Sequence, residues 1–471
     1  MTASRVGFWG GIAFFLLLLA LPAPAGLSEP AWRVAAITLL MATWWMTEAM
    51  PITATAFLPF ILGPLLGVMT AEDVAGEYYS GVLFLLLGGA FIALAIERTG
   101  LHRRVALFIV SHGGTSVRAL LFAVMTATAL LSMLVSNTAT ALIMLPIAMS
   151  VVKASRGDGP RTGPDPFAIT LTLGVAYAAS IGGLGTLVGS PTNVIAAGLI
   201  EKTTGYVLDF PTWAAFGIPI VLISIPVCWW LLITLNRLGH ASLNADQVRE
   251  AIGEAGPWTS PERRLVPIIA VTVLAWAFLP FIEGGVLPRG AINDGTIGIV
   301  AGSLLLVIPG GDGRPLLRWP EARAAPWDVI MMFGGGLALA ALITTTGLAQ
   351  WIGDQLTPFT SMPVWIVATI VVAVIILVTE FASNVATASG FIPVIAGMVV
   401  VSGIDPALLA VPAAMAASWG FMLPSGTGPN AFAYATGELR VADMVRAGFL
   451  LDLIGLPIIV GCVFAVATLM S

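Results

Sequence analysis

Apolar runs of about 20 residues recur from one end of this 471-residue chain to the other. A helix needs about that many apolar residues to cross the hydrocarbon core of a bilayer. The chain is 58% hydrophobic and only 10% charged, a balance that a water-soluble domain of this size cannot bury. We therefore predict an all-α polytopic membrane protein without a soluble domain of any size.

The apolar runs predict eleven transmembrane helices and leave two long apolar stretches, 119–152 and 362–403, unassigned. Each of these stretches is interrupted near its middle by polar residues, Ser136-Asn137-Thr138 in the first and Ser383-Asn384 in the second. Polar, non-helical backbone is tolerated at mid-bilayer depth only inside protein or beside a water-filled cavity. We therefore predict two re-entrant helical hairpins. The predicted crossings are residues 11–27, 34–50, 54–69, 81–97, 167–200, 212–235, 265–282, 295–309, 327–346, 407–436 and 447–469.

The basic residues predict the orientation of these crossings, because Lys and Arg favour the cytoplasmic side. With the N-terminus inside, 17 of the 20 Lys and Arg residues are cytoplasmic, and only Arg33, Lys202 and Arg289 are external. Arg118 and Lys153 flank the first hairpin, which then enters from the cytoplasm, whereas the second enters from outside. The prediction is a multi-pass protein of the cell (inner) membrane with a cytoplasmic N-terminus and an external C-terminus.

The chain also repeats itself. A shift of 247 residues aligns Gly88-Gly89 with Gly335-Gly336 and Ser136-Asn137 with Ser383-Asn384, and a shift of 237 aligns the turn ending at Asn193 with the one ending at Asn430. The two halves start on opposite sides, so we predict inverted-topology repeats with a binding site at their interface. The predicted organisation is N-terminal scaffold helices over 1–80, a first repeat over 81–235, a cytoplasmic loop and linking helices over 236–326, and a second repeat over 327–471.

Four interruptions of the helices, the two hairpin tips and the two Pro/Gly turns, define the candidate site. A helix N-terminus suits a carboxylate or another oxyanion, whereas exposed carbonyl oxygens suit a hard cation such as sodium. No Lys or Arg lies at the predicted midplane, so the counter-charge for a bound anion must come from helix ends and co-bound cations. For Glu48 and Glu380 we favour structural hydrogen bonding over a direct role.

Several motifs together resemble the divalent anion/sodium symporter family, which includes bacterial and animal di- and tricarboxylate transporters. They are Trp44-Trp45-Met46-Thr47-Glu48-Ala49-Met50-Pro51, Glu97-Arg98-Thr99-Gly100-Leu101, Ser136-Asn137-Thr138, Thr379-Glu380-Phe381-Ala382-Ser383-Asn384 and the two Pro–Asn turns. The resemblance covers essentially the whole chain. It implies a homodimer in which a fixed scaffold domain carries a mobile transport domain that works as an elevator.

The resemblance also implies site residues. One sodium site matches Ser132, Ser136, Asn137 and Gly189, and a second matches Thr379, Ala382, Asn384 and Gly426. The residues that match the substrate site are Ser136, Asn137, Thr138, Ser190, Pro191, Ser383, Asn384, Val385, Thr427 and Gly428. Two positions depart from the family pattern: Val385 replaces a threonine, which removes one hydroxyl, and Gly428 stands where a proline is usual.

The function expected from these observations is sodium-coupled symport of small dicarboxylates of the succinate, malate and fumarate class. The alternatives on the same fold are an electroneutral dicarboxylate exchanger and a sodium-coupled carrier of tricarboxylates or inorganic oxyanions. An enzyme is not expected, because the sequence holds no recognisable set of nucleophile, acid–base pair or metal cluster. We expect no cofactor, Na⁺ as the coupling ion, membrane lipid as surroundings and no nucleic-acid partner.

Overall fold

The computed structural model describes residues 3–114, 116–156, 165–239, 243, 253, 256–282, 288, 290–355 and 362–470. Arg161, Arg249 and Arg289, which entered the orientation argument, lie outside these ranges. Within them the protein is built from helices, and its β-structure is one isolated bridge between Pro309 and Pro315. Eight helices are long and apolar enough to cross a membrane, so the predicted all-α membrane fold is confirmed at this level.

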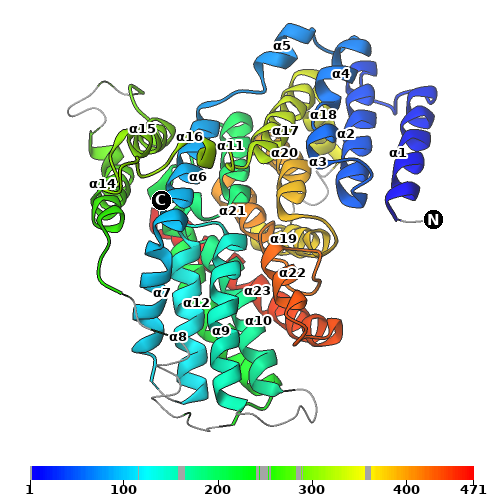
Figure 1. Ribbon diagram of the computed structural model, residues 1–471. Coiled ribbons are helices and arrows are strands. Elements are labelled where there is room, and N and C mark those ends of the chain that lie inside the picture. The colour runs from blue at the N-terminus through cyan, green and yellow to red at the C-terminus, as the bar shows by residue number, and fades with distance from the viewer. Residues whose placement is uncertain are drawn as a thin grey trace.

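The helices follow one another along the chain as labelled in Figure 1. Their bounds are α1 Ala3–Ala20, α2 Glu29–Thr47, α3 Ile52–Thr55, α4 Leu58–Leu65, α5 Ala71–Gly76, α6 Gly81–Thr99, α7 Leu101–Ser111, α8 Val117–Ser132, α9 Asn137–Arg156, α10 Pro166–Gly183, the 3-10 turn η1 Leu187–Gly189, α11 Pro191–Thr204, α12 Phe210–Leu235, α14 Ser260–Ile282, α15 Asp294–Val307, α16 Trp319–Ala322, α17 Trp327–Thr346, α18 Leu348–Gln355, α19 Val364–Phe381, α20 Asn384–Ser402, α21 Pro406–Ala416, α22 Gly428–Ala435 and α23 Val441–Met470.

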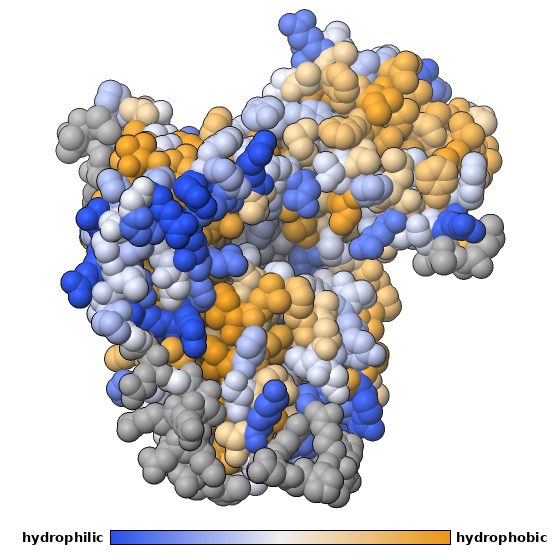
Figure 2. Space-filling model, viewed as in Figure 1, coloured by the Kyte–Doolittle hydropathy of each residue, from blue (hydrophilic) through white to orange (hydrophobic). Residues whose placement is uncertain are grey.

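The helices form two packed groups. One core joins α1, α2 and the short helices that follow to α17, at the upper right of Figure 1. The larger core contains α6 to α12 and the C-terminal helices α19 to α23. Helix α10 runs through the larger core, and each of its residues from Phe167 to Gly183 is buried, which explains why it has no polar face. Figure 2 shows that the outer surface over the N-terminal helices is largely apolar, as expected of a surface that faces lipid.

Two predicted crossings differ from the observed helices. The first was expected over 11–27, but α1 spans Ala3–Ala20, because Pro22 and Pro24 supply no N–H donor to continue a helix. The run 54–69 is divided into α3 and α4, with Pro59 near the start of α4 and Pro64 inside it. Neither piece reaches the length of a membrane crossing.

Both predicted hairpins fold as two helices joined by a short turn. The first is α8 and α9 and the second is α19 and α20. Helices α8 and α19 begin 247 residues apart, at Val117 and Val364, and α9 and α20 begin 247 residues apart, at Asn137 and Asn384. The same shift relates Gly100 and Gly347, which end α6 and α17 with φ values of 80° and 79°. Positive φ of this size favours glycine.

Candidate functional site

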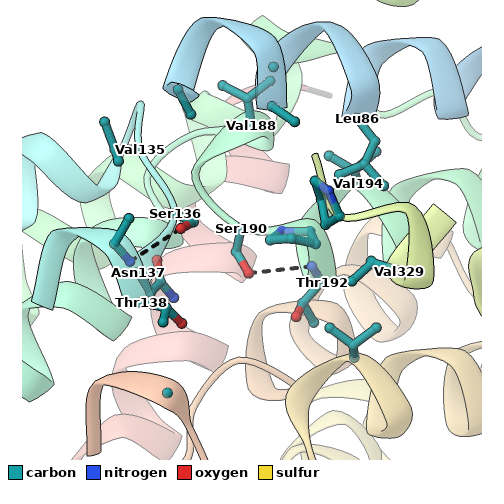
Figure 3. Close-up of a pocket in the computed structure, with 18 of the residues that line it drawn as sticks. Leu86, Val135, Ser136, Asn137, Thr138, Val188, Ser190, Thr192, Val194 and Val329 are labelled. Atoms are coloured by element: carbon teal, nitrogen blue, oxygen red, sulfur yellow. Dashed lines mark hydrogen bonds between the residues drawn. The ribbon is translucent and has the colours of Figure 1, made fainter. Parts of the chain in front are cut away.

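A cavity of about 450 Å³ lies where four helices begin. The helices are α9, α11, α20 and α22, and Figure 3 shows the side of the cavity formed by the α8–α9 tip and the start of α11. All ten residues that match the family's substrate site line this cavity, together with Asn137, Asn384, Ser136 and Gly426 of the predicted sodium sites. The two hairpin tips and the two turns, far apart in sequence, therefore share one space.

Each of the four helices is capped by a hydroxyl side chain at the cavity wall. Ser136 Oγ accepts from Ala139 N at 3.3 Å, and Ser383 Oγ accepts from Ala386 N at 3.2 Å. Ser190 Oγ accepts from Thr192 N at 3.3 Å, the dashed line in Figure 3, and Thr427 Oγ1 accepts from Asn430 N at 3.2 Å.

These caps satisfy only one donor per helix, although the first turn of a helix leaves four N–H groups without an intrahelical partner. The remaining N–H groups and the positive ends of four helix dipoles make the cavity suitable for an anion. Glu97 is the only charged side chain among its described lining residues, so no cation of the protein neutralises a bound anion there.

Oxygen atoms converge behind the first hairpin tip. One end of the Asn137 side-chain amide lies 2.7 Å from Ser132 Oγ, 3.2 Å from Ala179 O and 3.3 Å from Gly189 O. With its nitrogen at this end, the amide donates hydrogen bonds to these oxygens; with its oxygen there, four oxygens face one point. The second arrangement is stable only around a cation, and an oxygen-only set of this kind fits Na⁺.

The second hairpin repeats this arrangement. Thr379 Oγ1 lies 2.9 Å from Asn384 Oδ1 and 2.8 Å from Ala417 O, as Ser132 Oγ lies 2.7 Å from Asn137 Oδ1 and 2.7 Å from Ala179 O. Gly426 packs against carbonyl oxygens, with those of Glu380 and Thr379 3.5 and 3.7 Å from the position of an added Cβ. The donor set again consists of oxygens and again fits a hard cation.

Two buried asparagines hold the turns that face the hairpin tips. Asn193 Nδ2 donates to Gly183 O at 2.7 Å and to Thr186 O at 2.9 Å. Asn430 Nδ2 donates to Leu423 O at 3.1 Å, and Leu423 follows Thr186 by 237 residues. Both asparagines are fully buried, so each fixes the shape of a turn and lies behind the wall of the cavity.

Glu380 supports the second turn from behind. Its carboxylate accepts from the backbone N–H of Phe421, from Met422 N at 2.8 Å and from Leu423 N at 3.3 Å. The structural role predicted for Glu380 is therefore confirmed. The Glu48 side chain is exposed at the end of α2, and there the hydrogen bonds are made by its backbone: its N–H donates to Trp44 O and its carbonyl accepts from Ser4 Oγ.

Glycine allows close approach at two points of the site. A Cβ on Gly183 would lie 2.1 Å from Asn137 Oδ1, and a Cβ on Gly428 would lie 2.3 Å from Thr138 Oγ1. Gly428 thus permits contact between the first tip and the second turn, which explains why its departure from proline matters. Val385 lines the cavity with its apolar side chain.

Sequence reasoning missed several contributors. Ala179 and Ala417 supply backbone oxygens, which leave no trace in residue identity. The apolar wall opposite the tips includes Leu86, Val194 and Val329, and Figure 3 labels all three. Glu97 also lines the cavity, and its place in the Glu97–Leu101 motif was the available signal. Four predicted sodium ligands, Ser132, Gly189, Thr379 and Ala382, lie outside the cavity lining.

Comparison with known proteins identifies relatives over the whole chain. A family profile described as the sodium:sulfate symporter transmembrane region matches residues 5–470. The sodium-dependent dicarboxylate transporter SdcS of Staphylococcus saprophyticus is 36% identical over 98% of this chain and 90% of its own length. The SdcS of Staphylococcus aureus strain USA300 is 37% identical over 98% of this chain and 91% of its own.

Among solved structures, the YdaH transporter of Alcanivorax borkumensis matches with a TM-score of 0.59 and 16% identity, over 94% of this chain and 98% of that one. At this identity the match speaks for the fold alone.

Proposed function

This chain belongs to the sodium:sulfate symporter family, and we propose that it is a membrane transporter that couples the uptake of small dicarboxylates to Na⁺. The observation that carries this proposal is the cavity where four helix N-termini meet between two matching oxygen clusters. A dianion placed there receives N–H donors from four helices, and cations held behind the tips supply the missing positive charge. The relatives named for sodium-dependent dicarboxylate transport support the choice of substrate class.

We assign the ligands as the sequence predicted them. Na⁺ would be held by Ser132, Ser136, Asn137 and Gly189 in one site and by Thr379, Ala382, Asn384 and Gly426 in the other. The substrate carboxylates would meet Ser136, Asn137 and Thr138 on one side and Ser383, Asn384 and Val385 on the other, with Ser190, Pro191, Thr427 and Gly428 completing the wall. Asn137 and Asn384 belong to both sets, so cation binding would orient the amides that receive the substrate.

We further propose eleven crossings, two re-entrant hairpins and two inverted repeats, over 81–235 and 327–471, that work as an elevator. The equal shifts between helix starts and between hydrogen-bond networks support a repeat. The distribution of Lys and Arg supports a cytoplasmic N-terminus and an external C-terminus. In this arrangement residues 1–80 and the 236–326 segment belong to a scaffold through which the chain forms a homodimer.

The test is uptake of labelled succinate by the purified protein in liposomes. We expect uptake to require an inward sodium gradient and to stop when potassium replaces sodium. Uptake that ignores sodium but needs dicarboxylate inside the liposomes would instead identify an exchanger. Sulfate or citrate that competes with labelled succinate more strongly than unlabelled succinate would transfer the proposal to an oxyanion or a tricarboxylate.

A further inference from the structure

A second cavity lies between α14 and α15, away from the substrate site. It has a volume of about 470 Å³ and is lined almost entirely by apolar side chains. On α14 the lining residues include Pro267, Ile268, Val271 and Ala275, whose spacing places them on one face of the helix. Val271 is 65% exposed and Val300, on the facing helix, is 53% exposed. The cavity is therefore an open groove along the surface of the protein.

Two arginines stand at one end of this groove. Arg264 precedes Pro267 by three residues and Ile268 by four, so it continues the same helix face. Its Nη1 donates to Pro309 O at 2.6 Å, just beyond the end of α15, which holds the guanidinium over the groove. Arg263 beside it is exposed. Among the described residues no acidic side chain forms an ion pair with either arginine, and a guanidinium has five N–H donors to offer.

The surroundings of the arginines suit the headgroup level of a membrane. Trp258 is 46% exposed two residues before α14 and lies under the Arg104 guanidinium, 4.6 Å from its ring centroid. Exposed tryptophan and arginine concentrate where headgroups meet the hydrocarbon core. In Figure 2 hydrophilic residues around α14 and α16 adjoin an apolar patch over α15.

The length of the groove agrees with one leaflet of a bilayer. From Arg264 to Ala275 the α14 helix rises by about 16 Å, at about 1.5 Å per residue. Half of the ~30 Å hydrocarbon core is about 15 Å. An acyl chain that follows the groove would therefore end near the midplane when its phosphate lies at the arginines.

We propose that the groove between α14 and α15 binds an anionic glycerophospholipid, with one acyl chain along the groove and the phosphate held by Arg263 and Arg264. Charge complementarity identifies this occupant, because two arginines without acidic partners adjoin a chain-length apolar channel. The bound lipid belongs to the leaflet on the arginine-rich side of the protein. This site is independent of the substrate, so the failure of either proposal leaves the other standing.

The test uses the full-length protein after delipidation in detergent. Phosphatidylglycerol or phosphatidylcholine with the same acyl chains is added, and bound lipid is counted by native mass spectrometry. We expect a preference for phosphatidylglycerol that falls by roughly fivefold for each arginine removed in Arg263→Gln and Arg264→Gln. Arg440→Gln is the matched control, since Arg440 is an exposed arginine paired with Asp443, and it should keep the preference. Val271→Trp, which fills the groove, should lower binding of both lipids, whereas Leu222→Trp on α12 should not.

Three results would overturn the proposal. The first is an equal affinity for the two lipids, and the second is an unchanged preference in both arginine variants. The third is a change of oligomeric state in Val271→Trp without a change in lipid binding, which would make the groove a contact between copies of this chain. Soluble glycerol 3-phosphate tests the source of the phosphate: no effect is expected, and competition with phosphatidylglycerol would make the site one for a free phosphate ester.

Discussion

Asn137 and Asn384 each place a side-chain amide between a hydroxyl and a cavity wall. Replacing either with alanine removes a ligand and leaves neighbouring polar atoms without a partner, at a cost of about 1–3 kcal/mol. We expect Asn137→Ala and Asn384→Ala each to lower sodium-driven succinate uptake at least tenfold while the yield of folded protein stays unchanged. Asn236→Ala is the control, because Asn236 caps α12 away from the cavity. Uptake at the normal rate in either variant would remove that asparagine from the site.

Gly183 tests the first oxygen cluster without changing a ligand. An added Cβ would lie 2.1 Å from Asn137 Oδ1, so Gly183→Ala must displace the amide. We expect the sodium concentration for half-maximal uptake to rise by about tenfold and the variant to remain folded. Gly461→Ala, also inside a helix but with no atom within 4 Å of the new Cβ, should behave like the unchanged protein. Equal sodium dependence in both variants would contradict a cation site at Asn137.

Val385 tests the departure from the family signature. Val385→Thr adds a hydroxyl of nearly the same shape to the cavity wall, and one hydrogen bond contributes about 1 kcal/mol. We expect the relative affinities for succinate, malate, fumarate and citrate to change by about fivefold in competition assays. Val378→Thr, on the other hairpin arm, serves as the control. An unchanged order and spacing of affinities would mean that residue 385 does not face the substrate.

The residues of the site were predictable to the extent that side chains carry it. The Ser-Asn pairs and the Pro–Asn turns are visible in the sequence because each makes a hydrogen bond that few other residues can make. Ala179 and Ala417 were not predictable, because only their backbone oxygens take part. The contact between Gly428 and Thr138 is likewise a property of two segments that the sequence does not place side by side.

At the scale of elements, α7 is fixed to the start of α14 by Arg104. Its guanidinium donates to Glu262 Oε1 and Oε2, each at 3.0 Å, and also to the carbonyls of Gly256 and Pro257. Burial by itself would raise the pKa of Glu262, but hydrogen bonds from Arg104 and Thr259 outweigh it and hold the pKa below its usual range. The stabilisation is therefore present above the ordinary glutamate pKa of about 4.3 and is lost as the pH falls through the lower folded-state value.

We expect Arg104→Gln to lower the free energy of unfolding by about 2 kcal/mol at neutral pH, because Glu262 keeps its burial and loses its charged donor. The measurement is the thermal midpoint in detergent, repeated at a pH below 4, where the difference should shrink. Arg440→Gln, which removes a highly exposed partner of Asp443, should lower the midpoint much less. A larger difference in acid than at neutral pH would contradict the assignment.

Element boundaries were predictable where a side chain or glycine ends a helix. Gly100 and Gly347 end α6 and α17 close to the predicted positions, and the polar residues at 136–138 and 383–384 do separate the arms of two hairpins. The run 54–69 was not predictable from hydropathy, because Pro59 and Pro64 leave the composition apolar while the backbone bends. The turn over 417–427 is longer than the 184–190 turn, which the repeat alone did not indicate.

At the scale of the whole molecule, transport should respond to voltage. A dianion that enters a negative interior alone is opposed by about 2.3 kcal/mol per charge per 100 mV. Two sodium ions make the cycle neutral, and a third makes an inside-negative potential favourable. The two oxygen clusters account for two ions. We expect sodium-dependent uptake in liposomes, and acceleration by a potassium diffusion potential if a third ion takes part. Inhibition by an inside-negative potential would mean that fewer than two ions accompany the substrate.

The cavity's use of helix ends in place of basic side chains affects leakage. A site built around lysine or arginine would be charged when empty and neutral when it held only its anion. Here the tips and turns carry no charged side chain, so they are neutral when empty and, with two sodium ions and a dianion, neutral again when full. Every partial load is charged, and exposing an unbalanced charge to a low-dielectric barrier costs several kcal/mol. Slippage, in which sodium or substrate crosses without the other, is then suppressed by electrostatics alone, without a separate gate that senses occupancy.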